Sequence, residues 1–241
     1  MQQQPPPPVE APAPQAEIEP VIRHPIQPAQ PPGEASALPP LDESDEATRA
    51  ALAGLLSQDW IQEFFQLDGI IRRIVVTIDN LPRRQVPPKY MLVKPTGPQF
   101  LAIGEEESIF LNPDNYRRYT PFVRLAEAVE TKKLVKGYVQ FYPLFQQAYK
   151  DLGYPSGYFN DRLVEAIDNL LAAPDIKGPV KLVRPKVMYQ FADPKLEARS
   201  AGQKILMRMG SEDAGRIKTK LQEIRRALTD QAPDLRSPAA G

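Results

Sequence analysis

Apolar side chains between residues 41 and 81 recur at the three- and four-residue spacings of amphipathic helices. Ser44 or Asp45 can cap the first of these helices, and the pattern stops at Leu81-Pro82, because proline interrupts a helix. Two or three short helices are therefore predicted. The apolar positions are Leu52, Leu55, Leu56, Trp60, Ile61, Phe64 and Phe65, then Ile70, Ile71, Ile74, Val75 and Ile78.

The segment from Thr131 to Leu152 carries two adjacent apolar rows at helical spacing. A helix that is apolar over so much of its circumference should be buried, and its aromatic residues are then core side chains. Pro143 lies inside this helix and predicts a kink, since Tyr142 is a poor cap for a second helix. The two rows are Leu134, Tyr138, Phe141, Phe145, Ala148 and Leu152, with Val135, Val139, Tyr142 and Tyr149 beside them.

Later helix starts combine a capping side chain with proline at the first helical position. This pattern occurs at Asn112-Pro113, Thr120-Pro121 and Asp193-Pro194. Ser211 opens the last helix, because the acidic residues that follow it complement the positive end of the helix dipole.

Short apolar runs broken by glycine and proline predict a few strands. Residues 90–93 and 100–103 should form a small hairpin, with 109–111 as a third strand, and residues 180–191 should be extended. The fold class is therefore mainly α: a single helical domain with a small β hairpin or minor sheet.

Residues 1–40 contain 13 of the 28 prolines and few large apolar side chains. Such a composition favours solvated polyproline II over a packed element, because little apolar surface offsets the entropy of ordering. We interpret residues 1–40 as a disordered proline-rich linker, 41–230 as the helical domain and 231–241 as a disordered tail. A ligand for proline-binding modules is the alternative for the arm, although Pro5–Pro8 lacks a flanking basic residue.

The chain has no cysteine, and its single histidine, His24, lies in the arm. The domain therefore lacks the side chains of thiol enzymes, Ser-His-Asp hydrolases, zinc sites and haem sites, and we expect no cofactor and no metal. Basic and acidic residues number 30 each, and residues 41–241 hold 29 against 26, which is too small a surplus to indicate a nucleic-acid partner. No apolar run is long enough to span a bilayer, so the chain as given is expected to be soluble.

The link between the 131–152 helix and the next one suggests a binding corner. Tyr158 precedes Asn160, Asp161 and Arg162, and either Asn160 or Asp161 can cap the following helix. Phenol faces beside a fixed amide and charges suit a sugar or a peptide end. The alternative is a tight interhelical turn in which the tyrosines only pack.

Carboxylates would be needed for an enzyme with neither His nor Cys, such as a cell-wall glycan hydrolase. Asp161, Glu165 and Asp168 share one helix face at spacings typical of a solvated surface, which argues against this reading. The remaining candidate acids are Asp79 and Glu105 to Glu107. An enzyme is therefore the less favoured interpretation.

Two clusters of basic residues offer a further surface for a partner. Residues 70–94 contain six basic residues and a single acidic residue, Asp79. Within this stretch the pair Arg83 and Arg84 is a candidate docking site. The second cluster, residues 195–226, is interleaved with apolar positions and fits an amphipathic helix with a solvated basic face.

Three blocks, residues 71–84, 138–171 and 191–210, closely resemble the bacterial family called domain of unknown function 3014, and the resemblance extends over about 38–228. Members look like envelope proteins in which a membrane helix and a proline-rich linker precede one domain. The resemblance implies a location on the periplasmic side of the inner membrane, although this chain departs from the pattern by lacking the anchor. It implies no catalytic residue.

We therefore expect a non-enzymatic interaction or scaffold domain, held on a proline-rich spacer and associated with the envelope. The partner would be another envelope protein or a cell-wall component, with membrane contact only through an anchor. The alternative is a glycan hydrolase or glycan-binding module that uses Tyr158, Asn160 and Asp161.

Overall fold

The computed structural model describes residues 21–26, 38–95, 99–105 and 108–230. The other residues of the predicted arm and the predicted tail lie outside this description. Helices dominate the described residues, which confirms the mainly helical fold class with a minor sheet. The helices are α1 (Asp45–Ala53), α2 (Gln58–Phe64), α3 (Ile70–Asn80), α4 (Thr120–Ala128), α5 (Thr131–Asp151), α6 (Phe159–Leu171), α7 (Pro194–Glu197), α8 (Ala201–Arg208) and α9 (Ser211–Thr229). The strands are β1 (Ala102–Ile103), β2 (Phe110–Leu111), β3 (Leu182–Val183) and β4 (Gln190–Phe191).

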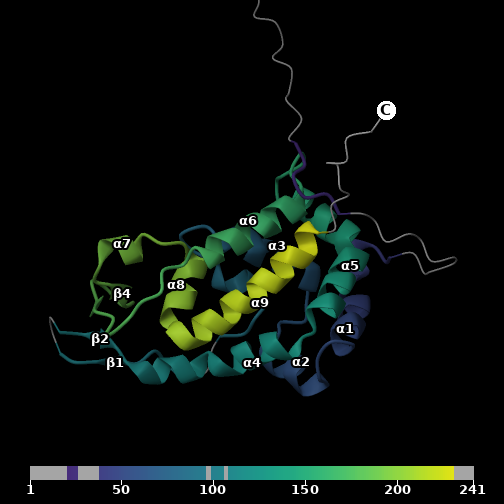
Figure 1. Ribbon diagram of the computed structural model, residues 1–241. Coiled ribbons are helices and arrows are strands. Elements are labelled where there is room, and N and C mark those ends of the chain that lie inside the picture. Colours follow the sequence, from purple (N-terminus) through teal and green to yellow (C-terminus); the bar gives the residue numbers. More distant parts are fainter. Residues whose placement is uncertain (1–20, 27–37, 96–98, 106–107, 231–241) are drawn as a thin grey trace, which may run out of the picture.

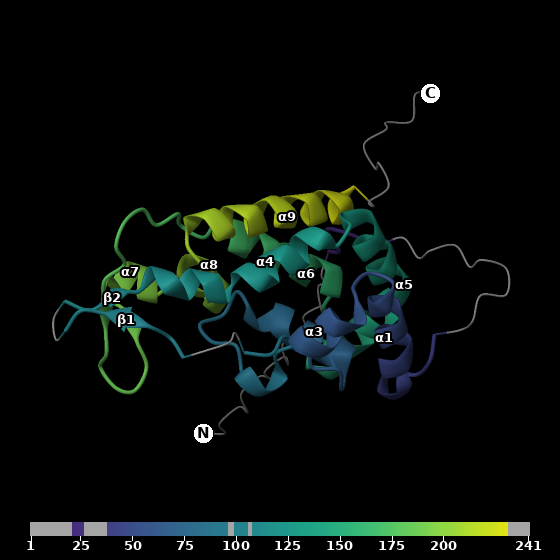
Figure 2. The same ribbon diagram turned by 90° about the horizontal axis from the view of Figure 1, so that it is seen from below.

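Five helices, α3, α4, α5, α6 and α9, build the centre of the domain. α9 lies against α4, α5 and α6, while α3 packs against α5 and α6 (Figure 1). α1 covers α3, and both hairpins lie at the end of the domain far from α1 (Figure 2). No helix among the described residues combines the length and the apolar character needed to cross a bilayer.

The aromatic residues of α5 form the main core, as the sequence pattern predicts. Phe141, Phe145 and Tyr149 are buried together with Phe159 of α6. The rings of Phe145 and Phe159 stack with centroids 5.8 Å apart and planes only 10° from parallel. α5 continues through Pro143 as a single helix, so the proline does not divide it.

The predicted caps are confirmed at two of the three sites. The side chains of Asn112 and Asp193 accept hydrogen bonds from the amides two residues later, at 2.9 and 2.8 Å. Thr120 does not cap a helix, because α4 already begins at this residue and its hydroxyl donates to Asp213 instead.

Asp45 has a different role from the predicted cap of its own helix. Its carboxylate accepts hydrogen bonds from the amides of Gly69 (2.8 Å) and Ile70 (3.0 Å), which lie at the start of α3. A carboxylate at a helix N-terminus complements both the unpaired amides and the helix dipole. Asp45 therefore fixes α3 against α1.

The predicted pairing of 90–93 with 100–103 is wrong. β1 pairs instead with β2, with Ala102 opposite Leu111, and the turn between them uses Gly104 at φ +93°. Glycine adopts this conformation without the steric cost that other residues bear. The second hairpin, β3 with β4, confirms that part of 180–191 is extended, and a bridge from Phe110 to Lys181 joins the two hairpins.

Gly202 allows α8 to lie close to α6 and to the end of α3. Its amide donates to the carbonyl of Leu81 at 2.9 Å, and a Cβ there would lie 2.5 Å from Leu170 Cδ2 and 3.2 Å from the Leu81 oxygen. Gly202→Ala should lower the free energy of unfolding by about 1–3 kcal/mol through overpacking. Gly215→Ala in α9 is the control, because nothing lies within 4 Å of its added Cβ. It should raise stability by roughly 0.5–1 kcal/mol in the same urea titration; equal effects of the two changes would contradict this packing.

Candidate functional site

The start of α6 is held by side chains of α5. Gln146 Oε1 accepts a hydrogen bond from the Phe159 amide at 2.9 Å, and Gln146 Nε2 donates to the carbonyl of Gly157 at 2.7 Å. The hydroxyl of Tyr142 donates to the same Gln146 oxygen at 3.0 Å. The prediction that Asn160 or Asp161 caps this helix is therefore wrong, because α6 begins at Phe159 and α5 supplies the acceptor.

Tyr158, Asn160 and Asp161 bind a segment of the chain's own arm, residues 21–26, which is purple beside α6 in Figure 1. The Asp161 carboxylate accepts hydrogen bonds from two consecutive amides, those of Arg23 at 3.0 Å and His24 at 2.7 Å. The three side chains, which we call the arm-binding triad, thus contact main-chain groups of the arm.

The other two members of the arm-binding triad complete the contact. The Tyr158 hydroxyl accepts a hydrogen bond from the amide of Ile26 at 2.7 Å, and the Asn160 side-chain amide donates to the carbonyl of His24 at 2.9 Å. The side chain of Ile26 is buried, whereas Val21 and Ile22 remain exposed. Recognition of the arm consequently combines four main-chain hydrogen bonds with one apolar anchor.

Asn160 is fully buried, and its side chain is held in one orientation. Its Oδ1 accepts from the hydroxyl of Tyr138 at 3.1 Å, so its amide nitrogen is left to face the arm. Burial raises the pKa of Tyr138 well above its ordinary value, and burial with a hydrogen bond to Tyr158 raises the pKa of Tyr142. Both phenols therefore stay protonated at physiological pH and position neighbouring groups.

Arg162 belongs to a second group, centred on Asp79 at the end of α3. Its Nε lies 3.0 Å from Asp79 Oδ1, and Nη2 of Arg83 lies 2.8 Å from Asp79 Oδ2. Arg83 also donates to the hydroxyl of Tyr154, and Arg162 is paired with Glu165 at 2.9 Å. The side chain of Asp79 is only 5% exposed, so these partners are what allow a charged carboxylate to be buried there.

The structure thus divides the predicted site residues into two sets. Tyr158, Asn160 and Asp161 meet at the arm, while Arg83 and Arg162 meet at Asp79 on the neighbouring surface. Arg84 is exposed and forms no hydrogen bond or ion pair with the described residues.

The sequence reading overlooked the supporting residues of α5, whose aromatic and apolar surroundings gave no sign of a polar role. Gln146, Tyr138 and Tyr142 each orient part of the corner. The sequence contained one indication of the ion pairs around Asp79, which is a single acidic residue among basic ones.

Most carboxylates considered for acid and base catalysis have structural partners. Asp161 holds the arm, Asp79 and Glu165 pair with arginines, and Asp168 pairs with Arg225 of α9. Glu106 and Glu107 lie outside the described residues. Within the described part of the chain, no group of three acidic, His or Cys side chains could hold a metal ion.

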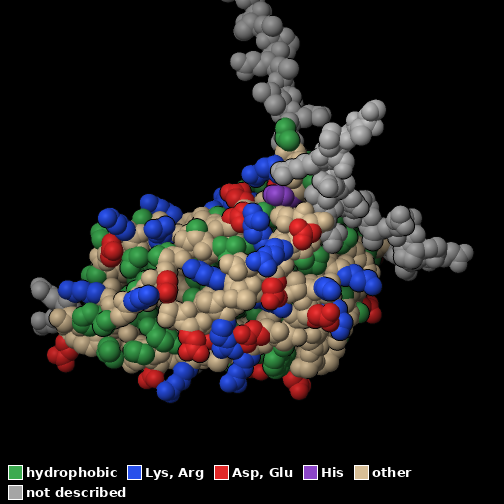
Figure 3. Space-filling view, viewed as in Figure 1, with side chains coloured by type: hydrophobic (Ala, Val, Ile, Leu, Met, Phe, Trp, Pro, Cys, Tyr) green, Lys and Arg blue, Asp and Glu red, His purple; other side chains and the backbone are tan. Residues whose placement is uncertain are grey.

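On the face shown in Figure 3, basic and acidic side chains alternate, and neither sign gathers into a single patch. Charge alone therefore does not mark a binding site on this face.

Replacing Asp161 tests the arm contact. Asp161→Asn keeps the shape of the side chain but leaves one acceptor for two amides, so exchange of the Arg23 and His24 amides should accelerate roughly tenfold or more. Asp168→Asn, which changes the same residue type on the same helix, should leave that exchange unaltered. Hydrogen exchange followed by NMR on the full chain makes the measurement. Unprotected amides in the wild type would refute the contact.

Removal of Asp79 should be far more damaging than removal of an exposed partner. Asp79→Ala leaves the largely buried Arg162 without its main counter-ion and should destabilise the domain by about 3–5 kcal/mol. Glu165→Gln removes a half-exposed carboxylate from the same arginine and should cost less than about 1 kcal/mol. Urea unfolding followed by circular dichroism compares them, and similar losses would show that burial of Asp79 does not govern stability.

Comparison with known proteins gives a family without an assigned activity. Residues 70–225 match the model of a family described as protein of unknown function, DUF3014. No curated protein and no solved structure matches the chain significantly. The matched range includes α3, the Asp79 group and the arm-binding triad, and covers more than half of the sequence. The chain belongs to the DUF3014 family.

Proposed function

We propose that this protein is a non-enzymatic interaction domain that recognises an extended polypeptide segment at the start of α6. The observation that carries the proposal is the recognition of main-chain groups. The arm-binding triad forms hydrogen bonds with the amides of Arg23, His24 and Ile26 and with the carbonyl of His24. Main-chain hydrogen bonds supply affinity in this mode of recognition, and side-chain pockets supply specificity.

Specificity at this site comes from Ile26. Its side chain is 7% exposed, while Val21 is 83% exposed. A competing segment would therefore need two consecutive residues with free amides. It would also need an apolar residue three positions after the residue that supplies the first of these amides. The arm occupies this site in cis, and a partner segment with the same features would compete with it when its local concentration is high.

A glycan would use the same three side chains. Their polar groups are already satisfied by the arm, and no feature of the described residues favours a sugar over a main-chain segment. Recognition of polypeptide is therefore the better-supported function.

The proposed setting is the bacterial envelope, where the domain would act as a scaffold on the periplasmic side of the inner membrane. This part rests on the resemblance of three sequence blocks to envelope proteins. Replacing Ser156, an exposed residue next to the arm-binding triad, by a photo-crosslinking phenylalanine analogue in the full-length protein in cells would identify the partner by mass spectrometry. Capture of cytosolic proteins alone would contradict an envelope role.

Binding in trans is tested by weakening the arm in cis. In the full chain, Arg23→Pro with His24→Pro removes both amide donors to Asp161. A fluorescent peptide of residues 21–26 should then bind this chain more tightly than the wild type, whose own arm competes. Adding Asp161→Asn should abolish the binding, whereas Asp168→Asn should not. If fluorescence anisotropy detects no binding to the double-proline chain, the site does not accept a segment in trans.

A further inference from the structure

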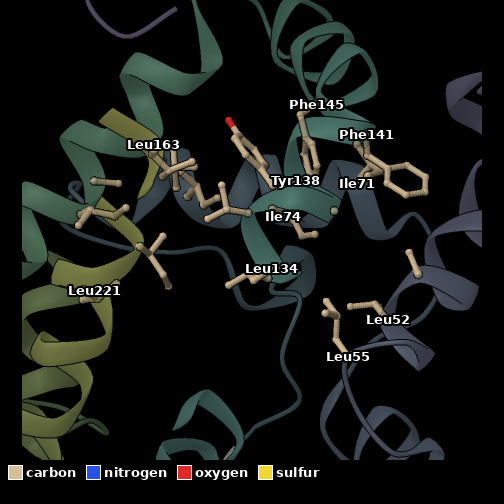
Figure 4. A pocket seen from close by; sticks show the side chains of 18 of the residues that line it. Leu52, Leu55, Ile71, Ile74, Leu134, Tyr138, Phe141, Phe145, Leu163 and Leu221 are labelled. Carbon is tan, nitrogen blue, oxygen red and sulfur yellow. The ribbon is translucent and has the colours of Figure 1, made fainter. Parts of the chain in front are cut away.

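A large apolar cavity, partly open to solvent, lies between the helices of the domain. It has a volume of about 310 Å³ and is lined by α1, α3, α5, α6 and α9 (Figure 4). Protein interiors are normally close-packed, with few voids larger than a water molecule. An apolar space of this size between packed helices is therefore a candidate ligand site.

The lining excludes polar ligands. Of the described residues that line it, Thr48 and Tyr138 alone carry a polar side-chain group. The Thr48 hydroxyl already donates to the Ser44 carbonyl at 2.7 Å. The hydroxyl of Tyr138 is likewise engaged, with Asn160. A sugar, nucleotide or peptide placed inside would lose its hydrogen bonds to water without replacement, which is costly.

The lining of the cavity extends from α1 to α9. In Figure 4, Leu52 of α1 and Leu221 of α9 lie on opposite sides of the α5 residue Leu134, and Ile74 of α3 and Leu163 of α6 complete the wall. Several of these side chains remain partly accessible although they lie between helices, because they face the cavity. An apolar cavity on the order of 150 Å³ stays dry and binds benzene, so one of this size and shape accommodates a longer hydrocarbon.

Parts of this chain outside the described residues do not suit the cavity. Residues 27–37 contain only alanine and proline as apolar residues, residues 231–241 contain one leucine, and residues 1–20 contain one valine and one isoleucine apart from Met1, Ala and Pro. None of these segments supplies a continuous apolar surface. These segments are therefore not the occupant we expect.

We propose that this cavity binds the hydrocarbon chain of a fatty acid or lipid, with the polar head group left outside. Such a ligand matches the cavity in length and in chemistry: its methylene groups need no hydrogen bonds, and transfer of each from water is favourable. This site is separate from the arm-binding triad and does not depend on the proposed polypeptide recognition.

Gly137 of α5 offers a way to fill the cavity without disturbing its walls. It lines the cavity, and a Cβ added there meets nothing within 4 Å. Gly137→Leu should also favour the helix, since leucine is a better helix former than glycine. Gly215→Leu in α9 is the matched control, because this glycine is exposed, equally free of neighbours and not part of the lining.

The test uses the full chain with dansyl-labelled undecanoic acid as the fluorescent probe. Wild type and Gly215→Leu should bind the probe alike, and Gly137→Leu should weaken binding by about tenfold or more, because the added side chain overpacks the occupied cavity. Displacement by oleic acid identifies a single-chain ligand, and displacement by a soluble short-chain phospholipid identifies a lipid. Absence of probe binding to the wild type, or displacement by neither competitor, would overturn the proposal.

A second measurement does not depend on the variants. Isotope-labelled oleic acid bound to the wild-type protein should show NMR contacts from its chain to the methyl groups of Ile74 and Leu163. Contacts restricted to exposed apolar residues such as Val187 and Met188 would place the ligand on the surface and refute the cavity site.

Discussion

The burial of one charge, that of Asp79, ties α3 to the start of α6. A carboxylate that is 5% exposed is tolerated only when it is well paired, and here α6 and the turn after α3 provide the two guanidinium groups. Arg162 thereby fixes the first turns of α6 relative to α3, while Arg83 reaches Tyr154 in the link that precedes α6. The arm-binding triad begins four residues after Tyr154, so its position follows from this ion pair.

Asn160 connects the corner with the interior. Its oxygen accepts from Tyr138, a residue that also lines the apolar cavity, and its nitrogen donates to the arm. A side-chain amide with both ends engaged has one orientation, which depends on the position of the tyrosine ring. The arm contact and the cavity wall are therefore joined through a single buried phenol, over two hydrogen bonds.

The sequence predicted the helices well, because periodicity and caps are local signals. It also singled out Tyr158, Asn160 and Asp161, which the structure places against the arm. Their ligand was not predicted, because contacts between residues more than 130 positions apart leave no local pattern. The cavity was not predicted for a related reason. In the sequence its lining residues have the pattern of an ordinary core, and only the arrangement of the five helices shows the space between them. The hairpin prediction paired 90–93 with its neighbour in the sequence. In the structure Val93 forms a bridge with Phe65 instead, and Pro88–Tyr90 forms a 3-10 helix.

Tethering has a quantitative consequence for the arm. Because residues 21–26 belong to the same chain as their binding site, they meet it at an effective concentration that is in the millimolar range for short connections. A dilute competitor with the same intrinsic affinity would almost never displace them. Under the proposed function, the arm would therefore give way to crowded or multivalent segments and not to isolated ones.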